Sequence, residues 1–230
     1  MKIISNQPIL ILGGFLISSK TYSAMSSWLK IKTTFPVKVV EASRFDWLST
    51  NWTYGWKNLL DRVDKEVEAL RLLSPTGKVT LIGHSSGGVM LRLYLADAKF
   101  AGRIYSGLEK CDSLITLGSP NNATRATPLR AMVSRKYPGA FFSNSVNYIS
   151  VAGNLDLQSE NASFISRRFA KSSYKSILNS QDKLKGDGLV PIESSLLEGS
   201  TQIILSDTAH SGLFGKSWYG SINRLNQWFL

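Results

Sequence analysis

One short segment, Leu81–Gly88 (Leu-Ile-Gly-His-Ser-Ser-Gly-Gly), constrains the fold of this chain more than any other. Its first two residues, Leu81 and Ile82, complete an apolar, β-branched run that starts at Lys78. Such a run favours a strand. It precedes an apolar segment, Val89 to Leu95, which is too long and too regular for a loop and favours a helix. The order strand, tight turn, helix is typical of a sheet that is covered by helices.

Residues 83–87 in this turn fit the pattern G-x-S-x-G, which places a serine at the apex of a strained strand-to-helix turn. Glycines on either side have no Cβ that would clash there. The N-terminus of the following helix favours negative charge. The pattern therefore predicts Ser85 as a nucleophile. A chance match in a Gly- and Ser-rich turn is the alternative, and the flanking strand and helix count against it.

Strands alternate with helices over most of the length. A buried strand is expected at residues 8–12, and further strands are expected at residues 37–40, 78–82, 111–117, 147–152 and 201–205. Helices are expected at residues 19–30, 56–70, from the serine turn to about 100, and 218–229, with residues 42–54 as a loop. This alternation predicts an α/β fold, a mostly parallel sheet flanked by helices on both faces, in a single domain over residues 1–230.

Two stretches, residues 119–146 and 155–185, depart from this alternation because they are long, basic, rich in Ser and Asn and only weakly periodic. Each follows a strand, at the sheet edge where open α/β proteins bind ligands. We interpret them as a small basic lid or cap over the site. Two ordinary surface crossover segments are the alternative.

The composition restricts the cofactors and the compartment. The single cysteine, Cys111, excludes an intrachain disulfide and fits a reducing compartment. With only two histidines besides, a metal centre is not expected, and no cofactor is implied. No apolar run approaches the roughly 20 residues of a membrane span.

Lys2 and the apolar run Pro8–Leu16 could imitate a signal peptide, but a core strand is the better interpretation because the glycines after it have a use in the site. The Asn-x-Ser/Thr matches at 51, 122 and 161 are then chance. We expect a protein of the cytoplasm, or of the plastid stroma after processing, that is not secreted, does not span a membrane and contacts membranes at most peripherally.

A serine nucleophile needs a histidine base, and the chain offers His84 and His210. His84 adjoins Ser85, and neighbours in a strained turn point apart, so we expect a structural role for it. His210 follows the last strand and can fold back over the serine turn. We therefore predict His210 as the base. A lone surface-loop histidine is the alternative.

The base in turn needs a carboxylate to fix its tautomer. Asp187 lies in a Gly-flanked turn, Gly186–Pro191, and is the first choice. Asp156, which closely follows a strand, is the competitor, whereas Asp207 is too close to His210 in the sequence. The chain order serine, aspartate, histidine is the one expected of this type of turn.

Acyl transfer also needs hydrogen-bond donors for the developing oxyanion. One is the backbone N–H of Ser86, the residue after the nucleophile. The loop after the first strand, Gly13-Gly14-Phe15-Leu16, supplies the other, with the N–H of Phe15 preferred over that of Leu16. A plain strand-to-loop turn is the alternative for the two glycines.

Together, these motifs resemble the lipase/esterase branch of the α/β-hydrolase superfamily, and most of all the small lipase-like hydrolases of cyanobacteria and plastids. The resemblance spans nearly the whole chain and rests on the segments 13–15, 83–88, 116–120, 186–191 and 209–210. It implies an eight-stranded, mostly parallel sheet and a triad of Ser85, Asp187 and His210. Many such lipases have His-Gly where this chain has Gly13-Gly14, which bears on the geometry of the oxyanion loop.

The expected activity is that of a serine carboxylester hydrolase. An acyltransferase or a thioesterase with the same triad and a non-catalytic binding protein of the same fold are the alternatives.

Of the net charge of +11, ten basic and three acidic residues between 119 and 185 contribute +7. With the apolar residues Leu16, Phe141 and Phe142 assigned to the substrate or lid region, we expect a lipid or acyl-ester substrate and peripheral contact with an anionic membrane. A solvated basic face is the alternative, and nucleic acid is not expected because no recognition motif accompanies the charge.

Overall fold

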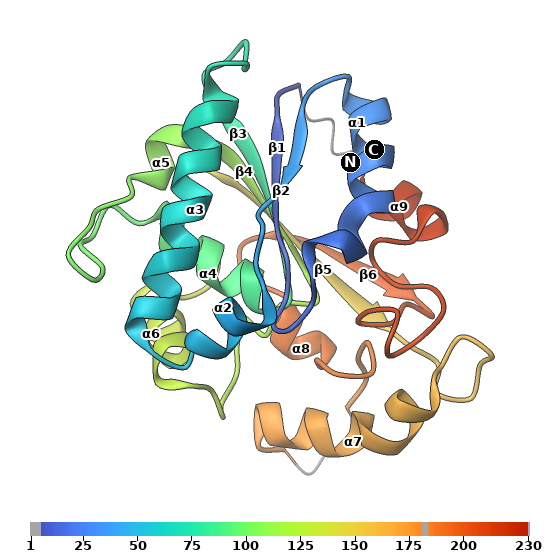
Figure 1. Ribbon diagram of the computed structural model, residues 1–230. Coiled ribbons are helices and arrows are strands. Elements are labelled where there is room, and N and C mark those ends of the chain that lie inside the picture. Colours follow the sequence, from blue (N-terminus) through green and yellow to red (C-terminus); the bar gives the residue numbers. More distant parts are fainter. Residues whose placement is uncertain (1–5, 181–183, 230) are drawn as a thin grey trace.

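A computed structural model describes residues 6–180 and 184–229. Within these ranges six strands form one wholly parallel sheet in the order β2-β1-β3-β4-β5-β6 (Figure 1). The strands are β1 (Ile9–Leu12), β2 (Val37–Val39), β3 (Val79–His84), β4 (Cys111–Leu117), β5 (Asn147–Asn154) and β6 (Thr201–Ser206). All six predicted strands are confirmed. The sheet is smaller than the eight strands that the resemblance implies.

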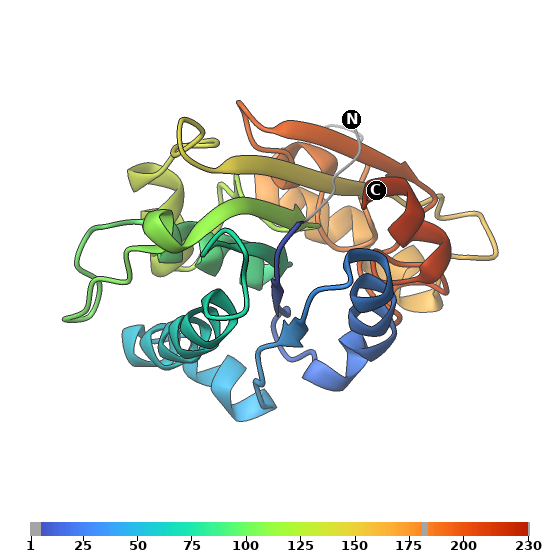
Figure 2. The same ribbon diagram turned by 90° about the horizontal axis from the view of Figure 1, so that it is seen from above.

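Helices cover both faces of this sheet, as predicted. The helices are η1 (Ser19–Tyr22), α1 (Ser23–Thr33), α2 (Arg44–Ser49), α3 (Thr53–Arg71), α4 (Ser86–Leu95), α5 (Gly107–Lys110), α6 (Pro128–Lys136), α7 (Phe164–Leu178), α8 (Ile192–Ser195) and α9 (Ile222–Trp228). α1 and α9 pack on one face, and α3 and α4 pack on the other (Figures 1 and 2). None of the helices in the described ranges is both long and apolar enough to cross a bilayer.

The pleat of the strands produces two separate cores. Successive side chains of a strand point to opposite faces, so Leu10 and Leu12 pack with α3 and α4, whereas Ile9 and Ile11 pack with α1 and α9. All four residues of β1 are fully buried. A strand that is buried on both faces reads as a continuous apolar run, and this explains why the sequence alone identified it.

Two expected boundaries differ from the structure. The segment 42–54, expected to be a loop, contains α2, whose first turn is closed by a capping box between Ser43 and Asp46. The helix after the serine turn was expected to reach about residue 100, but it ends at Leu95. There the chain leaves the helical conformation and then turns back through a bridge between Phe100 and Arg103.

The two irregular stretches each contain a helix that their weak periodicity did not reveal. α6 starts with Pro128, a residue whose fixed φ suits the first helical position. α7 is capped by the side chain of Ser163, which accepts a hydrogen bond from the N–H of Ser166. Both stretches return the chain from the carboxyl edge of one parallel strand to the amino edge of the next, so only part of each lies near the carboxyl edge.

Candidate active site

The turn between β3 and α4 holds Ser85 in a conformation that few side chains adopt. Ser85 has φ 53° and ψ −125°, outside the regions that L-residues favour. The neighbouring residues Gly83 and Gly87 have no Cβ, so other parts of the backbone can pack closely around this turn. A Cβ on Gly83 would lie 2.3 Å from the Cα of Gly88, and one on Gly87 would lie 2.4 Å from the carbonyl oxygen of Gly13. The G-x-S-x-G pattern is therefore explained by contacts with the adjoining helix and with the loop after β1.

His210 and Asp187 form a buried pair on loops at the same edge of the sheet. His210 Nδ1 lies 2.7 Å from Asp187 Oδ2, and the backbone N–H of His210 donates to the carbonyl oxygen of Asp187 at 2.7 Å. Because a carboxylate accepts, Nδ1 carries the proton and Nε2 keeps a lone pair. The competing Asp156 is exposed and accepts a hydrogen bond from the N–H of Gln158 instead.

The carboxylate of Asp187 is fully buried and is held by several donors. Oδ1 accepts from the N–H groups of Leu189 at 3.0 Å and Val190 at 2.8 Å, and Oδ2 accepts from the hydroxyl of Tyr219 at 2.8 Å. Burial, and then the charge of Asp187, raise the pKa of Tyr219 well above its ordinary value, so its hydroxyl remains a donor. These bonds fix the orientation of the carboxylate toward His210.

His84 joins the loop after β1 to the loop that carries His210. Its Nε2 lies 2.8 Å from the carbonyl oxygen of His210, so Nε2 donates, and its Nδ1 lies 2.7 Å from the hydroxyl of Tyr22 and accepts. That hydroxyl in turn accepts from the N–H of Gly14 at 2.9 Å. Burial, and then the neighbouring His210 ring, hold the pKa of His84 well below its ordinary value. His84 therefore lies where a structural histidine was expected.

The two expected oxyanion donors lie beside Ser85. Phe15 and Ser86 both line the cavity that contains Ser85, and so does Leu16, which adopts a φ of 60°. Ser86 is the first residue of α4, where N–H groups have no carbonyl partner within the helix. Among the described residues, no backbone hydrogen bond uses the N–H of Phe15.

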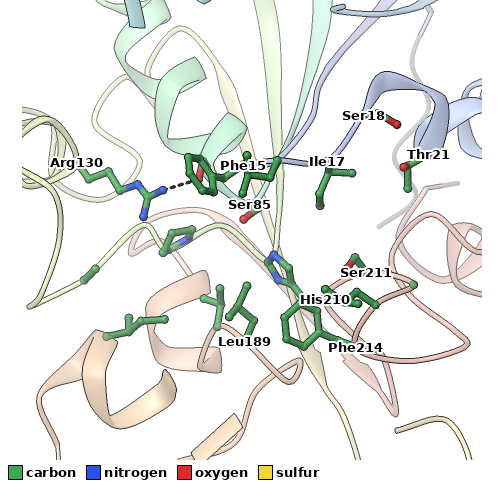
Figure 3. A pocket seen from close by; sticks show the side chains of 18 of the residues that line it. Phe15, Ile17, Ser18, Thr21, Ser85, Arg130, Leu189, His210, Ser211 and Phe214 are labelled. Atoms are coloured by element: carbon green, nitrogen blue, oxygen red, sulfur yellow. Dashed lines mark hydrogen bonds between the residues drawn. The ribbon is translucent and has the colours of Figure 1, made fainter. Parts of the chain in front are cut away.

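A cavity of about 730 Å³ opens at the carboxyl edge of the sheet, and both Ser85 and His210 line it. Figure 3 shows the hydroxyl of Ser85 and the ring of His210 facing the same space, although no hydrogen bond between these two described residues joins them. Apolar side chains, among them Phe214 and Leu189, form much of the remaining wall. In the described part of the chain no cluster of three or more His, Cys, Asp or Glu side chains could hold a metal ion.

Phe141 and Phe142 do not line this cavity, which corrects their assignment to the lid. They pack against Tyr137 and against each other just before β5 begins, at the opposite edge of the sheet. The reason is topological, because the end of the 119–146 segment must reach the amino end of β5. The parts of the two irregular stretches that do line the cavity include Arg130 of α6 and Ile177 of α7.

Three residues of the site gave no signal in the sequence. Tyr22 and Tyr219 support His84 and Asp187, and Arg130 donates to the side-chain oxygen of Ser86 at 2.6 Å. A single tyrosine or arginine in a helix or loop has no spacing that points to such a role. Only the three-dimensional contacts reveal it.

Comparison with known proteins supports the fold alone. No family model matches the sequence, and no curated protein resembles it significantly. Among solved structures, Staphylococcus hyicus lipase is similar with a TM-score of 0.58 at 14% identity, over 97% of this chain and 93% of that chain. A putative hydrolase of the alpha/beta superfamily from Xanthomonas campestris pv. campestris has a TM-score of 0.45 at 11% identity and covers 87% of both chains.

Aspergillus fumigatus lipase B has a TM-score of 0.44 at 14% identity, over 64% of this chain, and the chain spans only 37% of that protein. The order of the parallel strands, the strand–serine–helix turn and the full-length similarity to the staphylococcal lipase agree with one another. The chain has the α/β-hydrolase fold.

Proposed function

We propose that the protein is a serine hydrolase that cleaves carboxylic esters through Ser85, His210 and Asp187. The observation that carries this proposal is the placement of a strained serine turn and a buried His–Asp pair around one cavity. A serine that serves only as a turn residue has no need of a positive φ at the wall of a cavity. The full-length structural similarity to Staphylococcus hyicus lipase agrees with this proposal.

The chemistry follows from the orientation of the imidazole. Asp187 accepts a hydrogen bond from the Nδ1–H of His210, which leaves the lone pair on Nε2 free to take the hydroxyl proton of Ser85. The oxygen of Ser85 then attacks the ester carbonyl, and His210 returns the proton to the departing alcohol. Water attacks the acyl-enzyme by the same route, releases the carboxylic acid and restores the serine.

The backbone N–H groups of Phe15 and Ser86 would stabilise the negative oxygen of the tetrahedral intermediate. Loss of one such donor typically costs about 3–4 kcal/mol of transition-state stabilisation. Arg130 adds positive charge near this point, because its guanidinium bonds the side chain of Ser86. The fully buried His84 holds the Phe15 loop and the His210 loop at a fixed separation through Tyr22.

A fluorophosphonate probe that labels activated serines tests the proposal. We expect wild-type protein to be labelled and to hydrolyse short 4-nitrophenyl esters, and Ser85→Ala to lose both properties. Ser172→Ala is a matched control, because its hydroxyl lies on the exposed face of α7 and donates only to the carbonyl oxygen of Phe169. Full labelling of Ser85→Ala would refute the assignment.

The acceptor of the acyl group separates ester hydrolysis from acyl transfer, and the leaving group separates it from thioester cleavage. We propose ester hydrolysis, since exposed residues such as Arg44 and Arg125 line the cavity and leave it open to water. Product analysis with competing alcohols and with a matched thioester tests this choice. New esters formed with the competing alcohols as the main product would favour an acyltransferase. Faster turnover of the thioester than of the matched ester would favour a thioesterase.

A further inference from the structure

The cavity that contains Ser85 is lined by positive charge without any negative charge. Arg44 of α2, Arg125 and Arg130 all border it, and no aspartate or glutamate does so among the described residues. Arg44 and Arg125 are exposed at its rim, and Arg130 is half-buried. The charge of the cavity therefore differs from that of a purely apolar ester pocket.

Arg130 is the arginine of this cavity that contacts the residue after the proposed nucleophile. Its Nη2 atom donates to the side-chain oxygen of Ser86 at 2.6 Å, and Ser86 adjoins Ser85. In the described ranges its guanidinium makes no other hydrogen bond and no ion pair, although it carries five N–H donors in a fixed fork. Burial lowers the pKa of Arg130 from its ordinary value, as expected of a cation without a counter-charge.

Two arginines outside the cavity, Arg62 and Arg92, have several protein acceptors. Arg62 binds both carboxylate oxygens of Asp46, and the deeply buried Arg92 donates to the backbone carbonyl oxygens of Asn121 and Tyr137. A partly desolvated guanidinium without such acceptors is costly, unless a ligand supplies them. Arg130 is thus the arginine whose surroundings call for an external anion.

The space around Arg130 has room for such a group. A second hollow of about 270 Å³ meets the main cavity at Phe15, Ser86 and Arg130, and polar side chains such as Thr127 line it. It too has no acidic residue among the described residues that line it. In Figure 3, Arg130 lies on the opposite side of Ser85 from Thr21, so a ligand that spans the cavity passes the serine before it reaches the guanidinium.

We propose that the substrate is an acyl ester with an anionic group, a carboxylate or a phosphate, a short distance from the scissile bond, and that Arg130 pairs with this group. Arg44 and Arg125 attract the same charge at the rim. The inference rests on the proposed ester hydrolysis and names the class of ester. Arg130 thus determines specificity and takes no proton in the reaction.

Two matched substrate pairs test this inference and separate the two sources of charge. In the first pair, mono-4-nitrophenyl glutarate carries a carboxylate on the acyl side and 4-nitrophenyl pentanoate does not. In the second pair, 1-butyrylglycerol 3-phosphate carries a phosphate on the alcohol side and 1-butyrylglycerol does not. We expect kcat/KM to be at least tenfold higher for the anionic member of one pair, because charge-assisted hydrogen bonds are worth about 10- to 100-fold.

The variant Arg130→Gln should lower the anionic-to-neutral ratio of kcat/KM by about 10- to 100-fold. Arg130→Lys should retain part of the ratio, because it keeps the charge and loses the fork. Arg135→Gln is the matched control. Arg135 lies on the same helix and is exposed, and it does not line the cavity. The ratio is the readout because a change at Ser86 alone would affect both members of a pair equally.

The wild-type protein supplies an independent measurement. Raising the salt concentration should lower kcat/KM for the preferred anionic ester more than for its neutral partner. The inference is overturned if neither anionic ester is preferred, or if Arg130→Gln and Arg135→Gln change the ratio equally. Fluorophosphonate labelling of Ser85 with a preference for neutral esters would overturn it and leave the proposed function intact. Absence of labelling and of ester hydrolysis would instead overturn the proposed function.

Discussion

Acidification should destabilise this protein through one buried imidazole, that of His84. Burial, and then the adjacent His210 ring, hold the pKa of His84 well below the ordinary 6.5. Both ring nitrogens are already used, because Nε2 donates to the carbonyl oxygen of His210 and Nδ1 accepts from Tyr22. A proton on Nδ1 would replace an acceptor by a donor and break the contact with Tyr22.

The sign of the effect follows from proton binding. Below a pH of about 6.5, His84 binds a proton in the unfolded chain but not in the folded protein, so the free energy of unfolding falls as the pH falls. The loss continues until the pH reaches the lowered pKa of the folded state. One proton contributes at most about 1.4 kcal/mol per pH unit, and integration from about pH 7.5 to 5.5 gives about 1.4 kcal/mol.

Urea unfolding of wild-type protein and of His84→Gln at these two pH values measures the effect. The wild type should lose about 1.4 kcal/mol more than the variant, since His210 and the carboxylates are common to both. Equal losses would refute the reasoning. If the variant does not fold, NMR of the wild-type imidazole at about pH 5.5 decides the point, because a charged His84 ring in the folded protein would contradict it.

Two further predictions concern the support of Asp187 and the surface of α7. Tyr219→Phe removes a hydroxyl that donates to Asp187 and accepts from the N–H of Gly153. Urea unfolding should show that the free energy of unfolding falls by about 2–4 kcal/mol. A fall below about 0.5 kcal/mol would show that neither hydrogen bond stabilises the fold. α7 carries four basic residues, no acidic residue and the exposed side chains of Phe164 and Phe169. Replacement of both by Ser should weaken co-sedimentation with anionic vesicles about tenfold, and a wild type that binds neutral vesicles equally well would count against membrane contact.

Local sequence patterns predicted the strands and the serine turn, because burial and close packing at these positions restrict which residue types can occur there. The strand that ends at Leu12 is apolar throughout since both of its faces are covered. The turn at Ser85 could be recognised by its glycines, because the surrounding backbone leaves no space for a Cβ at these positions. His210 was chosen because the sequence has only two histidines, because His84 adjoins Ser85, and because His210 follows the last strand; its role as the base stays a prediction. In the structure His210 contacts Asp187, the carboxylate that lies between Ser85 and His210 in the sequence.

Contacts between distant segments could not be predicted in this way. Tyr22 reaches His84 across 62 positions of the chain, and Tyr219 reaches Asp187 across 32. Neither tyrosine has a neighbour in the sequence that marks it. Phe141 was assigned to the substrate region on composition alone, and composition does not indicate at which edge of the sheet a segment lies. Helix α6 escaped detection for a related reason, since only Val133 of its nine residues is buried.

The order of the strands has a consequence for synthesis of the protein. From β3 onward each strand is added at the outer edge of the sheet in the order in which the ribosome makes it. The serine turn and its helix can therefore be complete while the loop that carries His210, 126 positions after His84, has not yet been translated. A nascent chain that has emerged as far as β5 would display Ser85 without the proposed base, His210, and we expect it to be inactive. The proposed ester cleavage would then begin only when translation has passed the last strand.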